Sequence, residues 1–132
     1  MGKCTLTLIR GLPGSGKSTY AKSLNVLHLE DDHFCMQGGE YKWSKDTYLL
    51  NRRKLYHLAT HIIQWQVDCV VASIFWQASD ILEYKQLAKF QDFKFKVIKM
   101  TGNYGKDIHK VKKSHIKQMK EDWEDYPGEI SP

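Results

Sequence analysis

The chain has 132 residues, of which 42% are hydrophobic and 27% charged, and its formal net charge is +5. This length suits one domain around a single core, and the ordinary balance of apolar and charged residues excludes a disordered chain. No apolar run approaches the ~20 residues of a membrane-spanning helix, and the first residues lack the apolar core of a signal peptide. We therefore expect a cytoplasmic protein with no membrane contact, whose positive charge favours polyanionic partners such as nucleic acid.

The first third of the chain predicts two strands with a helix between them. Apolar and polar residues alternate over 4–10, which is typical of a strand. A glycine-rich loop follows, and a helix is expected over 17–24, where Asn25 ends it. Residues 26–29 predict a second short strand that leads into the acidic cluster 30–32.

The middle of the chain predicts a loop, a long helix and a buried strand. Residues 35–45 are rich in turn formers and predict a surface loop. A helix is expected over 45–66 with Ser44 as its cap, because its apolar residues follow the spacing of a buried helix face. These residues are Leu55, Leu58, Ala59, Ile62 and Ile63. Residues 67–75 are almost continuously apolar, which predicts a central strand covered on both faces.

The last third continues the alternation of helix and strand. A helix is expected over 80–90 with Ser79 as its cap, and an alternating stretch over 93–100 predicts the next strand. After a turn, residues 106–123 predict a basic helix, and the proline-containing tail is expected to be extended. Strands that alternate with helices predict a single α/β domain over 1–132, with a parallel sheet of four to five strands and helices on both faces.

One motif in this order carries chemistry. Residues 11–18 match the phosphate-binding pattern G-x-x-x-x-G-K-[ST] at every fixed position, between a predicted strand and a predicted helix. A chance match in a turn is the alternative, and the strand-to-helix context argues against it. The motif predicts a P-loop NTPase fold of the nucleotide-kinase type, which binds ATP or another nucleoside triphosphate together with Mg²⁺.

Each residue type of the motif suits that ligand. Glycines allow positive φ and let backbone N–H groups approach phosphate oxygens, and the helix N-terminus favours an anion. Lys17 is expected to reach the β- and γ-phosphates, and the Ser18 hydroxyl to coordinate Mg²⁺. The predicted nucleotide-binding residues are Gly11, Leu12, Pro13, Gly14, Ser15, Gly16, Lys17, Ser18 and Thr19.

Two acids follow the second predicted strand. Asp31 and Asp32 are therefore expected at the same sheet edge as the P-loop. A carboxylate there can accept the proton of an attacking hydroxyl or orient Mg²⁺-bound water. A solvated helix cap or turn is the alternative, because aspartate favours both positions.

Several stretches of the chain resemble the small P-loop kinase-like domains. This family includes the 5′-kinase domain of phage polynucleotide kinases and the kinase-like domains of NEDD4-binding proteins. The matching stretches are IRGLPGSGKSTYAKSL (9–24), EDDHF (30–34), GGEYKW (38–43), Asn51 with Arg52 and Arg53, and HIKQMKEDWE (115–124). The resemblance implies transfer of the γ-phosphate of ATP to a hydroxyl, often the 5′-hydroxyl of a nucleic acid. It also implies that Asp31 is the general base.

Three features depart from the family pattern. Ser73 stands where the family carries an aspartate after the third strand, and Phe34 stands where phage polynucleotide kinases place an arginine. The expected lid, over about 102–117, offers lysines in place of arginines. Lysine holds a phosphoryl group only as a point charge. From these departures we expect catalysis that is slower, differently built or lost.

The candidates for substrate contact are Asp32, Arg52, Lys110 and Lys112. The lid lysines suit a transferring phosphoryl group or a nucleic-acid backbone, and their alternative is a solvated basic helix face. The alternative for Arg52 is the polar side of an amphipathic helix.

Three functions follow from these features. The first is an ATP- and Mg²⁺-dependent kinase of a hydroxyl of a nucleic acid or nucleoside. The second is a catalytically weak ATP-binding module that acts through a protein or nucleic-acid partner. The third is a kinase of free nucleosides or nucleoside monophosphates.

Overall fold

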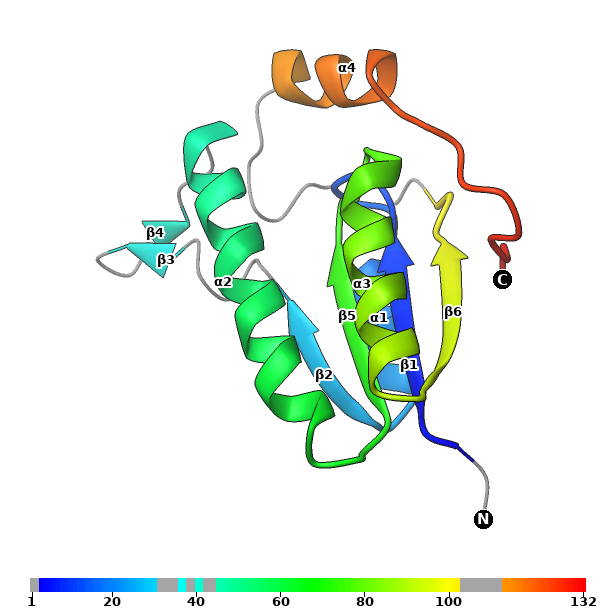
Figure 1. Cartoon of the computed structure of the whole chain (residues 1–132). Helices are drawn as coiled ribbons and strands as arrows, with labels where there is room; N and C mark the ends of the chain where they lie inside the picture. Colours follow the sequence, from blue (N-terminus) through cyan, green and yellow to red (C-terminus); the bar gives the residue numbers. More distant parts are fainter. Residues whose placement is uncertain (1–2, 31–35, 38–39, 42–44, 103–112) are drawn as a thin grey trace.

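The computed structural model of the chain describes residues 3–30, 36–37, 40–41, 45–102 and 113–132. Its centre is a sheet of four parallel strands in the order β2-β5-β1-β6 (Figure 1). The strands are β1 (Thr5–Arg10), β2 (Leu27–Glu30), β5 (Cys69–Ser73) and β6 (Lys94–Lys99). The predicted parallel sheet is confirmed, and its order makes β5 and β1 the inner strands.

Helices cover both faces of this sheet, as the sequence predicts. In Figure 1, α2 and α3 lie in front of the sheet and α1 behind it, while α4 lies beyond the carboxyl ends of the strands. The helices are α1 (Lys17–Ser23), α2 (Lys45–Ile63), α3 (Ala78–Phe90) and α4 (Lys113–Glu121). Among the described residues, no helix is long and apolar enough to cross a membrane.

The alternation of side chains along the strands builds a core on each face. Leu8 of β1 and Val71 of β5 are fully buried against α2 and α3, whereas Ile9 and Val70 pack with Ala21 of α1. Burial of one such aliphatic side chain stabilises the fold by about 1.5–3 kcal/mol. This explains why the almost continuous apolar run of the β5 region forms an inner strand.

Several predicted boundaries move. Asn25, with a φ of 55°, follows the last turn of α1 as expected. The helix predicted over 45–66 ends at Ile63, because the chain turns at Gln66, where φ is 57°. Its apolar pattern alone does not reveal this turn.

The region predicted as a surface loop contains a short antiparallel pair of strands. These are β3 (Met36–Gln37) and β4 (Glu40–Tyr41). Two-residue strands carry too little alternation for a sequence pattern to reveal them. Of the basic helix predicted over 106–123, residues 113–121 form α4, and residues 103–112 lie outside the described residues.

Ser79 is not the cap of α3, contrary to the sequence-based expectation. The N-cap residue is Gln77, whose side chain makes no capping hydrogen bond. Instead, the backbone N–H of Ala78 donates to Oε1 of Glu124, at 2.9 Å. A carboxylate from 46 positions later therefore satisfies this helix end and suits its partial positive charge.

The tail after α4 returns along β6 (Figure 1), but it is not extended throughout as predicted, because the chain turns at Pro127 and Gly128, where φ of Gly128 is 86°. We call residues 122–130 the strap. Ile130 forms a parallel bridge with Ile98, and its backbone exchanges hydrogen bonds with Val97 and Lys99 at 2.9 and 2.8 Å. The strap thus pairs with the outer edge of the sheet, alongside β6, through this single bridge.

Candidate functional site

The P-loop lies at the carboxyl end of β1 and leads directly into α1. Gly14 and Gly16 have φ values of 80° and 94°, in the left-handed region that glycine adopts without strain. The loop closes on itself through a hydrogen bond from the Ser15 N–H to the Leu12 carbonyl, at 3.1 Å. The structure therefore joins all the predicted nucleotide-binding residues, from Gly11 to Thr19, in one loop and helix start.

Gly11 packs closely against Met100, the residue that directly follows β6. A Cβ atom at this position would lie 2.9 Å from the carbonyl oxygen of Met100 and would also collide with the Ser15 hydroxyl. Only glycine fits that space without a shift of backbone, so the first glycine of the motif serves packing at the root of the loop.

Lys17 is the first residue of α1, and its side chain curls back over the loop. Its Nζ donates to the carbonyl of Leu12, at 3.1 Å. The first turn of α1 contains no acidic residue, and its N-cap residue, Gly16, offers no side chain. The loop therefore combines a lysine cation with the positive end of a helix, which is an arrangement that favours an anion.

A cavity of about 300 Å³ opens beside the P-loop. Leu12, Met100 and Trp123 give it apolar walls, and Ser15 and Lys120 also line it. The Ser15 hydroxyl and the Trp123 indole N–H are buried and make no hydrogen bond with the described residues. The accessible lining of this cavity is therefore mainly apolar, which suits an apolar part of a small molecule.

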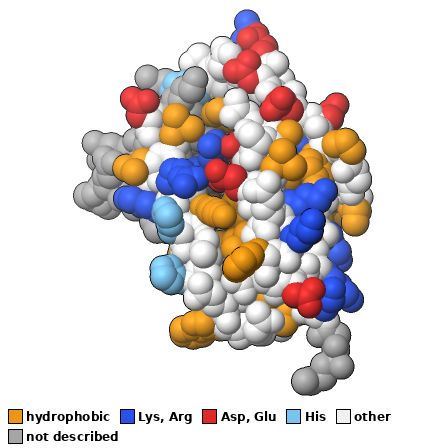
Figure 2. Space-filling view, viewed as in Figure 1, with side chains coloured by type: hydrophobic (Ala, Val, Ile, Leu, Met, Phe, Trp, Pro, Cys, Tyr) orange, Lys and Arg blue, Asp and Glu red, His pale blue; other side chains and the backbone are white. Residues whose placement is uncertain are grey.

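Arg52 lies in an ion pair between α2 and α3. Its Nη1 is 2.8 Å from Oδ2 of Asp80, whose side chain is only 4% exposed. Burial raises the pKa of Asp80 to about 6, although the neighbouring Arg52 acts in the opposite direction. Arg53 pairs with Glu83 beside it, and Figure 2 shows basic and acidic side chains meeting over these two helices. The predicted substrate contact of Arg52 remains a prediction, with this pair as its starting position.

Other predicted site residues are placed only in part. Ser73 ends β5 beside Arg10 and is buried, at 1% exposure. Asp31, Asp32, Lys110 and Lys112 lie outside the described residues.

Glu30, directly before Asp31, was expected only as part of an acidic cluster. It is buried at the end of β2, and its Oε1 lies 2.6 Å from Nε2 of His28. The described residues contain no group of three His, Cys, Asp or Glu side chains that could hold a metal ion.

A known protein matches part of this sequence. No family model matches the chain. A 55-residue stretch is 38% identical to an uncharacterised protein of Pasteurella multocida, covering 33% of this chain and 31% of that protein. The chain thus matches about a third of the length of this relative.

Solved structures share the fold over most of the chain. Kti12 of Chaetomium thermophilum, bound to ADP-AlF3, has a TM-score of 0.73 at 15% identity, over 96% of this chain and 88% of that chain. A gluconokinase of Sinorhizobium meliloti has a TM-score of 0.65 at 14% identity, over 96% and 81%. A chain of the Pnkp1/Rnl/Hen1 RNA repair complex has a TM-score of 0.65 at 15% identity, over 92% and 44%.

The fold is that of the P-loop kinases. The predicted α/β class is thereby confirmed, whereas the finer resemblance to phage polynucleotide kinases remains a prediction. Sequence reasoning missed three features of this P-loop kinase fold: the cavity, the burial of Arg10, and the attachment of the strap at Glu124. Residues 115–124, which match the kinase-like family, could have indicated the cavity, because Lys120 and Trp123 of this stretch line it.

Proposed function

We propose that this chain binds Mg²⁺ with ATP or another nucleoside triphosphate at the P-loop, and transfers the γ-phosphate to a hydroxyl of a nucleic acid or a nucleoside. The observation that carries this proposal is the loop itself, with left-handed glycines at 14 and 16 and Lys17 folded over its centre. Its backbone N–H groups, the lysine and the start of α1 all favour a phosphate chain.

The residues around the loop have separate roles in this proposal. Lys17 exchanges its bond to the Leu12 carbonyl for β- and γ-phosphate oxygens, and so stabilises the charge that builds up during transfer. Ser18, half-buried in the first turn of α1, offers one oxygen to Mg²⁺. When bound, Mg²⁺ neutralises phosphate charge. Asp31 accepts the proton of the attacking hydroxyl, a role that rests on the family resemblance and on its place directly after β2.

The cavity beside the loop suits the nucleoside part of the ligand. Its apolar walls match the faces of a base. A volume of about 300 Å³ lies at the lower end of the range for small-molecule sites.

The nucleic-acid acceptor rests on two weaker supports, which are the family resemblance and the net charge of +5. Among the structures that share the fold, one is a gluconokinase and another belongs to an RNA repair complex. The fold therefore does not choose the acceptor, and an acceptor panel must do so.

A nucleotide-binding module with little transfer activity is the second candidate. Ser73 favours it, because the carboxyl end of β5 carries a buried hydroxyl where the family carries an aspartate. The ion pair of Arg52 with Asp80 favours it as well, since this cation already has a carboxylate partner.

The deciding experiment measures ADP release from Mg²⁺-ATP in the presence of 5′-hydroxyl DNA, 5′-hydroxyl RNA or a panel of nucleosides. Lys17→Ala tests the loop, and Lys22→Ala, an exposed lysine in the last turn of α1, is the matched control. A kinase shows acceptor-stimulated release that is lost in Lys17→Ala and kept in Lys22→Ala. Tight binding of ATP without stimulated release would favour the binding module, and no binding at all would refute both candidates.

A further inference from the structure

A buried cation stands at the root of the P-loop. Arg10 is the last residue of β1 and directly precedes Gly11, and its side chain is fully buried. Its Nε and Nη2 donate to the carbonyl of Phe75 at 3.0 and 2.7 Å. Its Nη2 also donates to the carbonyl of Glu124, and its Nη1 to Oε1 of Glu129, both at 2.7 Å.

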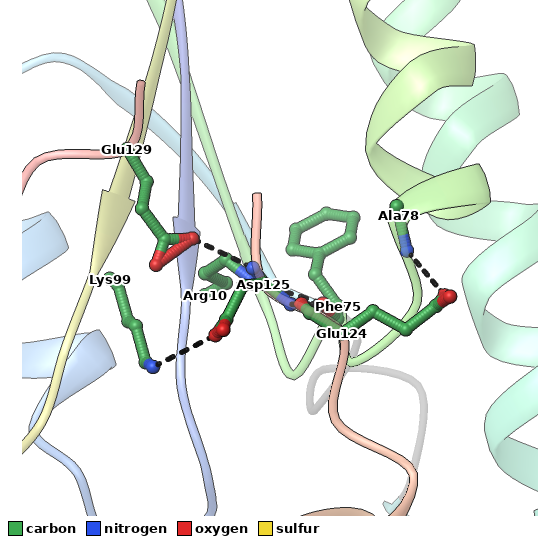
Figure 3. A network of polar contacts seen from close by, with 7 residues as sticks. All are labelled: Arg10, Phe75, Ala78, Lys99, Glu124, Asp125 and Glu129. Carbon is green, nitrogen blue, oxygen red and sulfur yellow. Dashed lines mark hydrogen bonds and ion pairs between the residues drawn. The ribbon is translucent and has the colours of Figure 1, made fainter. Parts of the chain in front are cut away.

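Two of these acceptors belong to the strap (Figure 3). Glu129 lies 119 positions after Arg10 in the chain, and Glu124 lies 114 positions after it. The indole ring of Trp123, also in the strap, covers the guanidinium at 4.2 Å from its centroid. The strap therefore supplies the carboxylate, one carbonyl and the aromatic cover that make burial of this cation tolerable.

The strap is itself tied to the turn between β5 and α3. The N–H of Glu124 donates to the carbonyl of Trp76 at 2.8 Å, and the carboxylate of Glu124 accepts from Ala78. Phe75, whose carbonyl receives two bonds from Arg10, has a φ of 49°, in the left-handed region that such a residue rarely adopts. Arg10, the strap and this turn thus hold one another in place.

The same turn holds the first residue of the P-loop. The N–H of Gly11 donates to the carbonyl of Ile74 at 3.3 Å, and the N–H of Met100 donates to the carbonyl of Arg10 at 2.8 Å. Ile74 directly precedes Phe75, whose carbonyl Arg10 binds. A shift of the Arg10 side chain would therefore disturb the backbone hydrogen bonds that hold Gly11 to Ile74 and Arg10 to Met100. A buried guanidinium that loses its partners cannot stay in place without a large cost, so the end of β1 would have to shift.

We propose that Arg10 is a positioning residue for the P-loop, and that the strap holds it in place through Glu129 and Trp123. Arg10 acts through the loop and touches no substrate, so the phosphate-binding geometry depends on residues far along the chain. The effect on nucleotide affinity rests on the proposed function, whereas the effect on the order of the loop does not.

The test compares wild type with Glu129→Gln and Arg10→Lys. Glu129→Gln removes the charge but keeps an oxygen acceptor, and Arg10→Lys keeps the charge but loses the planar fork. Glu121→Gln, which makes the same chemical change at an exposed residue of α4, is the matched control. Three quantities are measured for each variant: the affinity for Mg²⁺-ATP, the amide hydrogen exchange of residues 11–19 without nucleotide, and the urea midpoint of unfolding.

We expect Glu129→Gln and Arg10→Lys to bind Mg²⁺-ATP about tenfold more weakly, because loss of one buried charge-assisted hydrogen bond changes an equilibrium constant by about that factor. We also expect the amides of residues 11–19 to exchange faster in both variants. Glu121→Gln should match wild type in both measurements. A purely structural role would lower the urea midpoint and leave the affinity and exchange of the folded protein unchanged. That result, in either variant, would overturn the inference.

The inference and the proposed function fail separately. If wild type does not bind ATP, the proposed function fails, and loop exchange alone decides the inference: faster exchange in the variants supports it, and unchanged exchange overturns it. If one variant does not fold, the other provides the same comparison.

Discussion

Two arginines of this molecule, Arg10 and the partly buried Arg52, are held in different ways. Arg10, on the P-loop side, has two carbonyl acceptors, one carboxylate and an aromatic cover. Arg52, on the side of α2, has one described carboxylate partner, Asp80, in the first turn of α3. Carbonyls do not titrate, whereas Asp80 has a pKa of about 6.

The two arginines therefore differ in how their surroundings respond to pH: most acceptors of Arg10 do not titrate, whereas the partner of Arg52 does. Of the four hydrogen bonds that Arg10 donates to described residues, three go to backbone carbonyls, which do not titrate, and this suits a loop whose geometry must not vary. The pair of Arg52 and Asp80 depends on the ionisation of one carboxyl group. On the α2 side, the charge of this pair therefore changes as Asp80 titrates near pH 6.

The largest expected effect is loss of the Arg10 guanidinium. Arg10→Met should lower the free energy of unfolding by about 3–5 kcal/mol, because it leaves carbonyl groups and a carboxylate without their buried partner. Arg52→Met should cost less, about 1–3 kcal/mol, because Asp80 can take up a proton when its partner is gone. Urea unfolding of both variants measures the two costs. Equal costs would remove the proposed contrast between the two sides.

The second effect is the pH dependence of stability that Asp80 causes. Burial raises its pKa to about 6 from the ordinary 3.8, with Glu83 and Glu124 nearby acting in the same direction and Arg52 against it. The folded state therefore holds this proton more tightly than the unfolded chain. Its stabilising effect is complete below about pH 3.8 and is lost as the pH rises to about 6.

Asp80→Asn removes this titration and isolates it. The free energy of unfolding of wild type, minus that of Asp80→Asn, should fall by on the order of 2 kcal/mol between about pH 4 and pH 7. Urea unfolding at four pH values in this range measures the difference, in which the other titrating groups cancel. A difference that stays constant, or rises with pH, would contradict the raised pKa of Asp80 and with it the pH dependence of its pair with Arg52.

The features that could be predicted from the sequence are those with a local cause. The P-loop was predictable because residues 11–18 are contiguous and each residue type has a local reason. The sheet was predictable because the apolar runs of β1 and β5 follow the periodicity of strands. Both are short-range properties that a linear pattern records.

The strap was not predictable, because its contacts join residues far apart in the chain, up to 119 positions for Arg10 and Glu129. In an alternating strand Arg10 resembles an ordinary polar residue, and only the folded chain shows Glu129 and Trp123 around it. Arg52 was expected at a substrate, since its pattern gives no sign of Asp80 in the next helix. In each case the partner of the cation lies in another element of the fold, which a linear pattern does not record, and the predicted substrate contact of Arg52 stays a prediction.

The smallest expected effect tests the second attachment of the strap, which is the cap of α3. Glu124→Ala should lower the free energy of unfolding by about 1 kcal/mol, because the Ala78 N–H loses its carboxylate acceptor. Ser79→Ala, at the exposed residue that the local pattern favours as the cap, should change it by less than ~0.5 kcal/mol. Urea unfolding of both variants gives the comparison. The reverse order would mean that a local cap holds α3, and that the strap is fixed to the P-loop side by Arg10 and the edge of β6 alone.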